Sequence, residues 1–355
     1  MNNQQSAINN QQSTFSIVTP SYNQLDWLRL CVASVRDQIA PQSAISNHQS
    51  AILPALRVEH IIQDAGSPGI EEFAREVGAD FYRDGKKIAA YSLPIADSAS
   101  GDPDQQSTCS GSRAAGTTGL SIQNPASPYR IAIYCESDSG MYDAINRGRA
   151  RSTGEICAWL NCDEQYLPGA LSLVESWFNS NPDVEWMYAD AILVDESGNP
   201  ISYRRTCAPS AMHIRLCHLN TLSCSTFFKR QLVDEGFTFD TRYRAMGDAE
   251  WVYRIVRARR KVGAMRKATS AFTLTGDNLG TTPASIKEAE AWRREKAAPP
   301  TWLTLPCKLI HRMGKVLAGA YQNRTISISL YTKTSPLKRV IAQTKSFGFG
   351  WPTND

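Results

Sequence analysis

Apolar and polar positions in the first part of the chain follow the order typical of βαβ units. A short apolar run at residues 15–18 precedes a segment, 25–35, in which apolar residues recur at helical spacing. A second apolar run at 57–63 precedes a short helical pattern at 70–77. The order strand, helix, strand, helix predicts an α/β fold with a mostly parallel, Rossmann-like sheet.

The later patterns predict further helices and a second group of strands. Helical periodicity occurs at residues 141–151, 168–178 and 249–259, and Pro168 stands where a first-turn proline is expected. Residues 184–188 are typical of a strand, and residues 191–204 predict a hairpin with a glycine-containing turn. We therefore expect strands of mixed direction, an antiparallel annex, after the parallel part.

Three polar segments interrupt these patterns. Residues 1–13 and two inserts, at about 40–56 and 97–128, are rich in Ser, Gln, Gly and Pro, and the tetrapeptide QSAI recurs in the first two. Such composition cannot bury enough apolar surface to fold by itself. We expect one catalytic domain over 14–285 with two disordered surface inserts, followed by a helical, partly disordered extension over 286–355.

Composition restricts the class of protein. The formal charge of the 355 residues is only +4, which indicates no nucleic-acid partner. Nine cysteines without a CxxC pair are typical of reduced thiols, and no segment is long and apolar enough to span a membrane. We expect a cytoplasmic protein that can also lie peripherally at the inner face of the plasma membrane. Zinc is disfavoured because pairs such as His213 and His218 lack ligand-like spacing.

The most informative segment is the apolar run at 156–160, which ends in two adjacent carboxylates, Asp163 and Glu164. Ligands of open α/β sheets bind beyond the carboxyl ends of such strands. Two carboxylates at that edge suit Mg²⁺ or Mn²⁺, although a solvated acidic turn has the same composition.

Four segments, in order and spacing, resemble the inverting family 2 glycosyltransferases of the GT-A fold. They are FSIVTPSYNQLDWLRLCVASVRDQ, VEHIIQDAGS, ESDSGMYDAINRGRARSTGEICAWLNCDEQYLPGALSLVESWF and FDTRYRAMGDAEWVYRI. The resemblance covers most of residues 15–255 except the inserts. It implies a GT-A sheet and transfer of a sugar, with inversion, from a nucleotide-diphospho-sugar to a hydroxyl.

The resemblance also implies which residues bind the donor. The candidates are Thr19, Pro20, Tyr22, Asp64, Asp143, Asn146, Asn161 and Cys162. Asp64 has the alternative role of stabilising its own turn, and Asp143 that of capping a surface helix. Arg147 or Arg149 would approach the diphosphate, but a surface-helix role is favoured for both.

Residues 161–164 match the DXD motif that holds a divalent ion in this family. Asp163 is the expected ligand of Mn²⁺ or Mg²⁺, with Glu164 or Asn161 assisting; Asn161 replaces the first Asp of the motif. The resemblance places the catalytic base at Asp248, with Glu250 in reserve. The alternative for Asp248 is an acidic residue that stabilises a helix N-terminus.

Residues 302–324 combine Trp and Leu with basic residues. They are suited either to peripheral contact with an anionic membrane, where lipid-linked acceptors occur, or to packing on the catalytic domain. From 334 onward we expect weak order.

The sequence thus predicts a hexosyltransferase-type glycosyltransferase that acts on a saccharide or lipid-linked saccharide in cell-surface polysaccharide biosynthesis. One alternative is a sugar-nucleotide-binding module with impaired catalysis. The other, a sugar-phosphate nucleotidyltransferase, needs a Gly- and Lys/Arg-rich loop after the first strand, and TPSYN at 19–23 lacks one.

Overall fold

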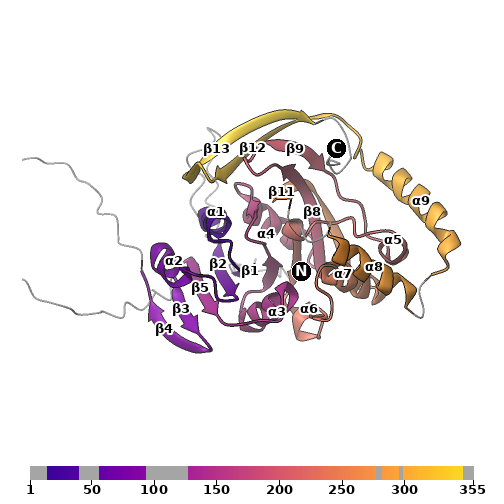
Figure 1. Ribbon diagram of the computed structural model, residues 1–355. Coiled ribbons are helices and arrows are strands. Elements are labelled where there is room, and N and C mark those ends of the chain that lie inside the picture. The colour runs from indigo at the N-terminus through magenta and orange to yellow at the C-terminus, as the bar shows by residue number, and fades with distance from the viewer. Residues whose placement is uncertain (1–13, 40–55, 93–126, 277–281, 296–298, 347–355) are drawn as a thin grey trace, which may run out of the picture.

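The computed structural model describes residues 14–39, 56–92, 127–276, 282–295 and 299–346 (Figure 1). The segment 1–13, nearly all of the first insert and most of the second lie outside the described residues, so their predicted disorder stays a prediction.

The described residues form strands and helices in the following order. The strands are β1 Thr14–Ser21, β2 Arg57–Asp64, β3 Asp80–Arg83, β4 Lys86–Ala90, β5 Tyr129–Cys135, β6 Ile156–Trp159, β7 Glu164–Tyr166, β8 Trp186–Val194, β9 Pro200–Arg204, β10 Thr226–Lys229, β11 Val262–Thr273, β12 Arg324–Thr332 and β13 Ser335–Ser346. The helices are α1 Leu25–Arg36, α2 Ile70–Val77, α3 Met141–Arg151, α4 Ala170–Ser180, α5 Ala211–Leu216, α6 Gln231–Asp234, α7 Gly247–Arg257, α8 Pro283–Arg294 and α9 Thr304–Leu317, with short 3₁₀ helices at Asp37–Ile39, Ser223–Ser225 and Thr301–Leu303.

Five neighbouring strands of the large sheet, in the order β3-β5-β2-β1-β6, are parallel. Helices α1 and α2 follow β1 and β2 along the chain, as the sequence pattern predicts. In Figure 1, α1 lies on the upper side of this part of the sheet and α3 on the lower side. The α/β class and the parallel Rossmann-like part are therefore confirmed.

Side chains of β1 alternate between the two helix layers. Phe15 and Ile17 pack in one core cluster with Cys31 of α1, whereas Val18 packs in another with Ile145 of α3. A Cβ atom at Gly148 of α3 would lie 2.4 Å from a methyl group of Val18, so only glycine permits this approach. The alternation fixes which residues of β1 face the core under α1.

The other half of the sheet is mixed in direction. Strand β10 is antiparallel to β6 and β8, β9 is antiparallel to β8, and β7 is antiparallel to β11. All nine residues of β8 are buried, which explains why its sequence is apolar except for Asp190, which pairs with Arg205. The antiparallel annex and the hairpin of β8 and β9 are confirmed, but β8 is one strand where the pattern indicated two.

Pro168 does not open a helix. Helix α4 begins at Ala170, and Gly169 before it has a left-handed backbone, with φ of 72°. Pro168 therefore belongs to the turn that leads into the helix.

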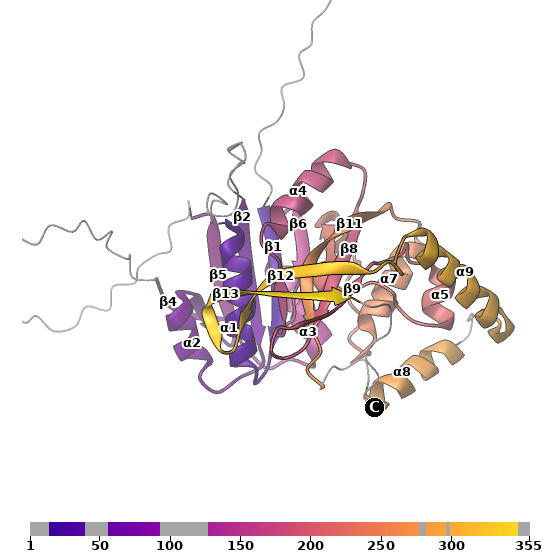
Figure 2. The same cartoon turned by 90° about the horizontal axis from the view of Figure 1, so that it is seen from above.

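The C-terminal extension contains a β-hairpin as well as helices. Strands β12 and β13 form a separate antiparallel sheet that packs against β9 and α1 (Figure 2). Arg339 of β13 forms hydrogen bonds with both carboxylate oxygens of Asp37, and Tyr331 of β12 bonds to Asp37 at 2.9 Å. The expectation of weak order from residue 334 is therefore wrong for 335–346, because the hairpin is tied to the end of the first helix.

The expected domain boundary between residues 285 and 286 falls inside α8. Within the described part of the chain, no helix combines the length and hydropathy needed to cross a bilayer.

Candidate active site

A cavity of about 960 Å³ lies beyond the carboxyl ends of β1 and β6. The carboxyl end of β1 and the loops after the two strands contribute Pro20, Ser21, Tyr22, Asn161, Cys162 and Asp163 to its wall. The starts of α3 and α7, the segment 218–223 and one side of α8 complete the wall. Loops from separate parts of the chain thus meet at the sheet edge where α/β proteins bind ligands.

Asp163 and Asn161 line this cavity, and both have side-chain oxygen atoms that could bind a metal ion. Burial raises the pKa of Asp163 to about 6, since water is partly excluded from its carboxyl group. The side-chain oxygen of Asn161 is buried without a hydrogen-bond partner among the described residues. A buried oxygen without a donor is costly for a protein, and a bound cation would satisfy it. These two residues fit the predicted Mn²⁺ or Mg²⁺ site.

Glu164 does not line the cavity. One carboxylate oxygen accepts a bond of 2.8 Å from the backbone N–H of Asn161, and the other accepts one of 2.8 Å from the hydroxyl of Ser223. Burial, and then the charge of Asp163, raises the pKa of Glu164 to about 8. In this arrangement both oxygens bond within the protein and shape the loop, and the direct metal contact of Glu164 stays a prediction.

Asp248 stands at the start of α7 and lines the cavity. Its Oδ1 accepts hydrogen bonds from the Tyr142 hydroxyl at 3.2 Å and from the backbone N–H of Ala249 at 2.8 Å. Burial raises the pKa of Asp248, and these two bonds oppose the rise. A carboxylate with a raised pKa is a stronger base, which suits proton abstraction.

Gly247 allows the close packing that orients Asp248. A Cβ atom at this position would lie 2.8 Å from the ring of Tyr142. The aromatic ring therefore packs directly on the first turn of α7.

Glu288 of α8 holds the loop that precedes Asp248, and sequence reasoning missed it. Its carboxylate accepts hydrogen bonds from three successive backbone N–H groups, those of Arg244 at 2.6 Å, Ala245 at 2.9 Å and Met246 at 3.1 Å. No local pattern identifies this contact, because the two segments are distant in the sequence.

Three predicted donor-binding residues line the cavity as expected. Pro20 lies at the carboxyl end of β1 and Tyr22 follows this strand, and the Tyr22 side chain is 60% exposed at the cavity wall. Cys162 is buried, and its thiol donates to the carbonyl of Pro20 at 3.1 Å, which joins the two loops.

Thr19 and Asn146 are directed elsewhere, which corrects two predictions. Thr19 points into the core, where its hydroxyl lies 2.9 Å from the ring of His60. Asn146 forms two hydrogen bonds with the backbone of Phe239, at 2.8 and 2.9 Å. Both side chains are fully engaged in internal contacts.

Asp64 and Asp143 support the alternatives given for them. Asp64 accepts bonds from the backbone N–H groups of Gly66 and Ser67 and from the Ser67 hydroxyl, and so stabilises its own turn. Asp143 caps its helix by accepting from the backbone N–H and hydroxyl of Ser139. Neither lines the cavity in this arrangement, and their donor contacts stay predictions.

Asp138, in the loop between β5 and α3, has a carboxylate that lines the cavity. The sequence analysis did not single it out. Burial raises its pKa, and its Oδ1 accepts a bond from the N–H of Gly140. Its place directly before the 141–151 helix was the available signal.

Arg147 and Arg149 of α3, the two arginines considered for the diphosphate, do not line the cavity. Arg147 pairs with Asp143 at 3.0 Å. The Arg149 side chain is buried among aromatic rings, 4.2 Å from the ring centre of Phe239, and burial lowers its pKa to about 9. The cavity instead contains Arg244 and Arg293.

Glu250, the reserve candidate for the base, is buried and bonds to Arg254 at 2.7 Å. It does not line the cavity.

Comparisons with known proteins give sequence relatives that are glycosyltransferases. Over 201 residues the chain is 23% identical to the PGL/p-HBAD biosynthesis glycosyltransferase of Mycobacterium tuberculosis and to that of Mycobacterium bovis. The aligned region covers 56% of this chain and 74% of each relative. This similarity supports a glycosyltransferase. No protein-family model matches the chain.

Solved structures that resemble this one include S. aureus TarS, with a TM-score of 0.48 and 13% identity over 85% of this chain. The chain spans 43% of the length of that TarS chain. Another is the mannosyltransferase PcManGT from Pyrobaculum calidifontis in complex with GDP-Man and Mn²⁺, with a TM-score of 0.48, 12% identity, and coverage of 87% of this chain and 72% of that one.

Proposed function

We propose that the protein is a divalent-metal-dependent, inverting glycosyltransferase of family 2 type, which transfers a hexose from a nucleotide-diphospho-sugar to a hydroxyl. The observation that carries the proposal is one cavity whose wall holds the oxygen atoms of Asn161 and Asp163 together with the carboxylate of Asp248. The sequence similarity to glycosyltransferases supports the same reading.

The donor would bind beside the loops after β1 and β6. The exposed ring of Tyr22 offers a flat surface for the base, and the guanidinium groups of Arg244 and Arg293 are suited to phosphate oxygens. Asn161 and Asp163 would hold Mn²⁺ or Mg²⁺, which, when bound, stabilises the negative charge of the departing nucleoside diphosphate.

Asp248 would act as the general base. Its carboxylate takes the proton of the acceptor hydroxyl while the hydroxyl oxygen forms a bond to the anomeric carbon. The bond from that carbon to the diphosphate oxygen breaks, and its electron pair leaves with the diphosphate. A single displacement inverts the configuration. Tyr142 would be a positioning residue, because its hydroxyl donates a hydrogen bond to Asp248.

We propose a saccharide or lipid-linked saccharide as the acceptor, with α9 in peripheral contact with the inner face of the plasma membrane. Large apolar side chains of α9 and the preceding turn are exposed: Trp302, Leu305, Leu309, Ile310, Met313, Val316 and Leu317. The exposed basic residues Lys308 and Arg312 lie among them, a composition that favours an anionic lipid surface.

The two alternative functions have different requirements. A sugar-phosphate nucleotidyltransferase needs a glycine-rich basic loop after the first strand, but β1 continues as a strand to Ser21. A binding module without catalysis retains the cavity and differs only in lacking turnover, so an activity measurement separates it from the proposed enzyme.

A panel of UDP-, GDP- and dTDP-sugars tests the proposal. Donors that raise the melting temperature with Mn²⁺ are first selected, because a ligand that binds the native state stabilises it. Release of nucleoside diphosphate is then measured with saccharide acceptors. We expect release from at least one donor, loss of release with EDTA, and recovery with Mn²⁺. Binding without any release would favour the binding module, and release of diphosphate from a nucleoside triphosphate and a sugar phosphate would favour the nucleotidyltransferase.

A further inference from the structure

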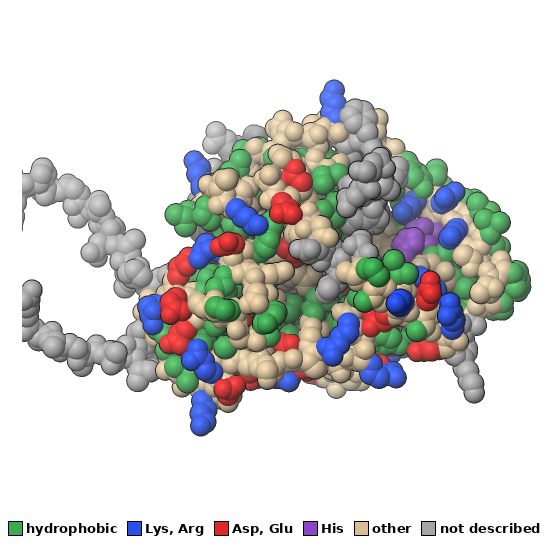
Figure 3. Space-filling view, in the orientation of Figure 1, with side chains coloured by type: hydrophobic (Ala, Val, Ile, Leu, Met, Phe, Trp, Pro, Cys, Tyr) green, Lys and Arg blue, Asp and Glu red, His purple; other side chains and the backbone are tan. Residues whose placement is uncertain are grey.

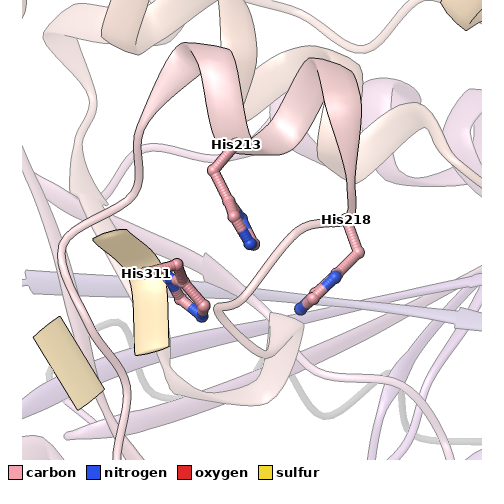
Figure 4. Close-up of side chains that lie close together, drawn as sticks. All are labelled: His213, His218 and His311. Carbon is pink, nitrogen blue, oxygen red and sulfur yellow. The ribbon is translucent and has the colours of Figure 1, made fainter. Parts of the chain in front are cut away.

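Three of the five histidines of the chain meet at the junction of α5 and α9. His213 belongs to α5, His218 follows that helix, and His311 belongs to α9. One ring nitrogen of each lies within 4.8 Å of the others, and the rings point into a common space (Figure 4). Small movements of these side chains would bring three imidazole nitrogens onto one metal ion.

Two nitrogen atoms of this cluster have no hydrogen-bond partner among the described residues. They are Nδ1 of His213 and Nε2 of His311, and both are buried. The rings of these residues stack with their centres 3.9 Å apart. A buried nitrogen without a hydrogen bond is unfavourable. Each of these two nitrogens therefore lacks a partner that takes up its lone pair or supplies a proton to it.

The low pKa values and the burial of the three imidazole rings favour their neutral form, which can donate a lone pair to a metal ion. Burial lowers the pKa of His218 and of His311 to about 4 and also lowers that of His213. A hydrogen bond between the His213 ring and the backbone of His218 opposes the shift at His213. A metal-bound imidazole commonly uses its second nitrogen in this way.

The charged groups that act on the rings are basic. They are Lys308, Lys315, Arg204 and Arg293, and Figure 3 shows exposed histidine side chains between Lys and Arg side chains. No carboxylate takes part in these interactions. A hard cation such as Mg²⁺ or Ca²⁺, which requires oxygen ligands, is therefore unsuited to the cluster. A metal that binds imidazole strongly, above all Zn²⁺, fits it.

Packing next to the histidines already joins the two helices. Cys217 and Cys307, four residues along the chain from His213 and His311 respectively, interact with each other and are buried. His218 also lines the large cavity, so the cluster lies at the edge of the candidate active site. A metal ion here would fix α9 to the wall of that cavity.

We propose that His213, His218 and His311 form a Zn²⁺ site that ties α9 to α5. Three protein ligands leave one position of a tetrahedral ion open for water or an anion, and the surrounding basic residues favour an anion there. The sequence analysis disfavoured zinc from the spacing of His213 and His218 alone. The third ligand comes from α9, which only the fold brings close.

Metal titration of the full-length protein, freed of any histidine tag and of bound metal, tests this proposal. Asp163→Asn is used as the background, because Asp163 and its neighbours are a second candidate site for cations. Zn²⁺ is titrated against a competing chromophoric chelator, and Co²⁺ is used to record the absorption bands of a tetrahedral site. We expect one equivalent of Zn²⁺ per chain and tetrahedral Co²⁺ bands.

Substitution of the ligands identifies the site. His311→Ala should weaken Zn²⁺ binding at least tenfold and abolish the rise in melting temperature with Zn²⁺, whereas Met313→Ala, an exposed residue of the same helix, should retain both. His218→Ala, at an exposed position, should behave like His311→Ala and serves if the latter does not fold. Zn²⁺ binding that is absent from the background protein, or equally tight in both histidine variants, would overturn the proposal.

Discussion

At the scale of single residues, position on a strand decided which polar side chains reach the cavity. Asn161 and Asp163 follow β6 in a loop and line the cavity, as the sequence predicts. Thr19 lies within β1 on the same side as Phe15 and Ile17, because alternate residues of a strand face the same way, and it is buried beneath α1. The segment TPSYN at 19–23 alone placed Thr19 near the ligand. The alternation along β1 was the signal that its side chain faces the core and not the cavity.

The acidity of Asp248 gives a prediction at this scale. In the proposed mechanism Asp248 must be ionised, so activity should fall as pH decreases through its raised pKa. The hydrogen bond from Tyr142 lowers that pKa, because it stabilises the carboxylate. Tyr142→Phe should therefore move the acidic limb of kcat/KM to higher pH.

The pH profile is measured for wild type, Tyr142→Phe and, as a control, Tyr22→Phe, whose hydroxyl belongs to an exposed ring of the same cavity. Only Tyr142→Phe should show an acidic limb that differs from that of wild type. An unchanged or lowered acidic limb in Tyr142→Phe would show that Asp248 does not control the rate.

At the scale of elements, local periodicity predicted the helices α2 and α3 and the buried strands, but it gave the C-terminal extension incorrectly. The alternation of Ile326, Ile328 and Leu330 in β12 is a readable strand signal, since these three side chains are buried together. The contact of Glu288 in α8 with the loop before α7 has no such signal. It depends on two elements that meet only in the folded chain.

Glu288 should control the placement of Asp248. Glu288→Gln replaces one acceptor oxygen by an amide group that cannot accept from the backbone N–H groups of 244–246. We expect kcat to fall by about tenfold, because the base is misplaced, with little change in the donor KM. Glu288 also raises the pKa of Asp248 by its charge, so the acidic limb should move to lower pH.

Glu290→Gln is the matched control, since Glu290 lies on the same helix and pairs with Arg294 at the surface. It should leave kcat and the pH profile unchanged. A Glu288→Gln enzyme with wild-type kcat and an unshifted pH profile would show that the hydrogen bonds of Glu288 have no part in positioning Asp248.

Across the whole molecule, the fold brings together segments that are distant in the sequence. The predicted parallel sheet was sufficient to place the loops after β1 and β6 at one edge, because carboxyl ends of parallel strands meet there. The meeting of α9 with α5 was not predictable, since the amphipathic pattern at 302–324 allows packing and membrane contact alike. The structure has α9 packed on one side through Cys307 and His311, with a row of apolar side chains left exposed on the helix.

The exposed part of α9 should bind anionic vesicles. Wild type should co-sediment with vesicles of phosphatidylcholine and phosphatidylglycerol, and less so at high salt, because each basic residue near the surface contributes about 1 kcal/mol. Leu309→Glu with Ile310→Glu should lose binding. Leu337→Glu, at an exposed apolar position of β13, should retain it. Equal sedimentation of all three proteins would exclude α9 as the membrane contact.

The central claim is that the cavity carries out sugar transfer with Asp248 as the base. Its most direct test compares wild type with Asp248→Asn, using a donor found to bind and an acceptor found to be used, and measures both transfer and donor affinity. We predict that transfer falls by about 10²- to 10⁴-fold, the usual contribution of a general base, while donor affinity is retained. Transfer at the wild-type rate by Asp248→Asn would contradict the account.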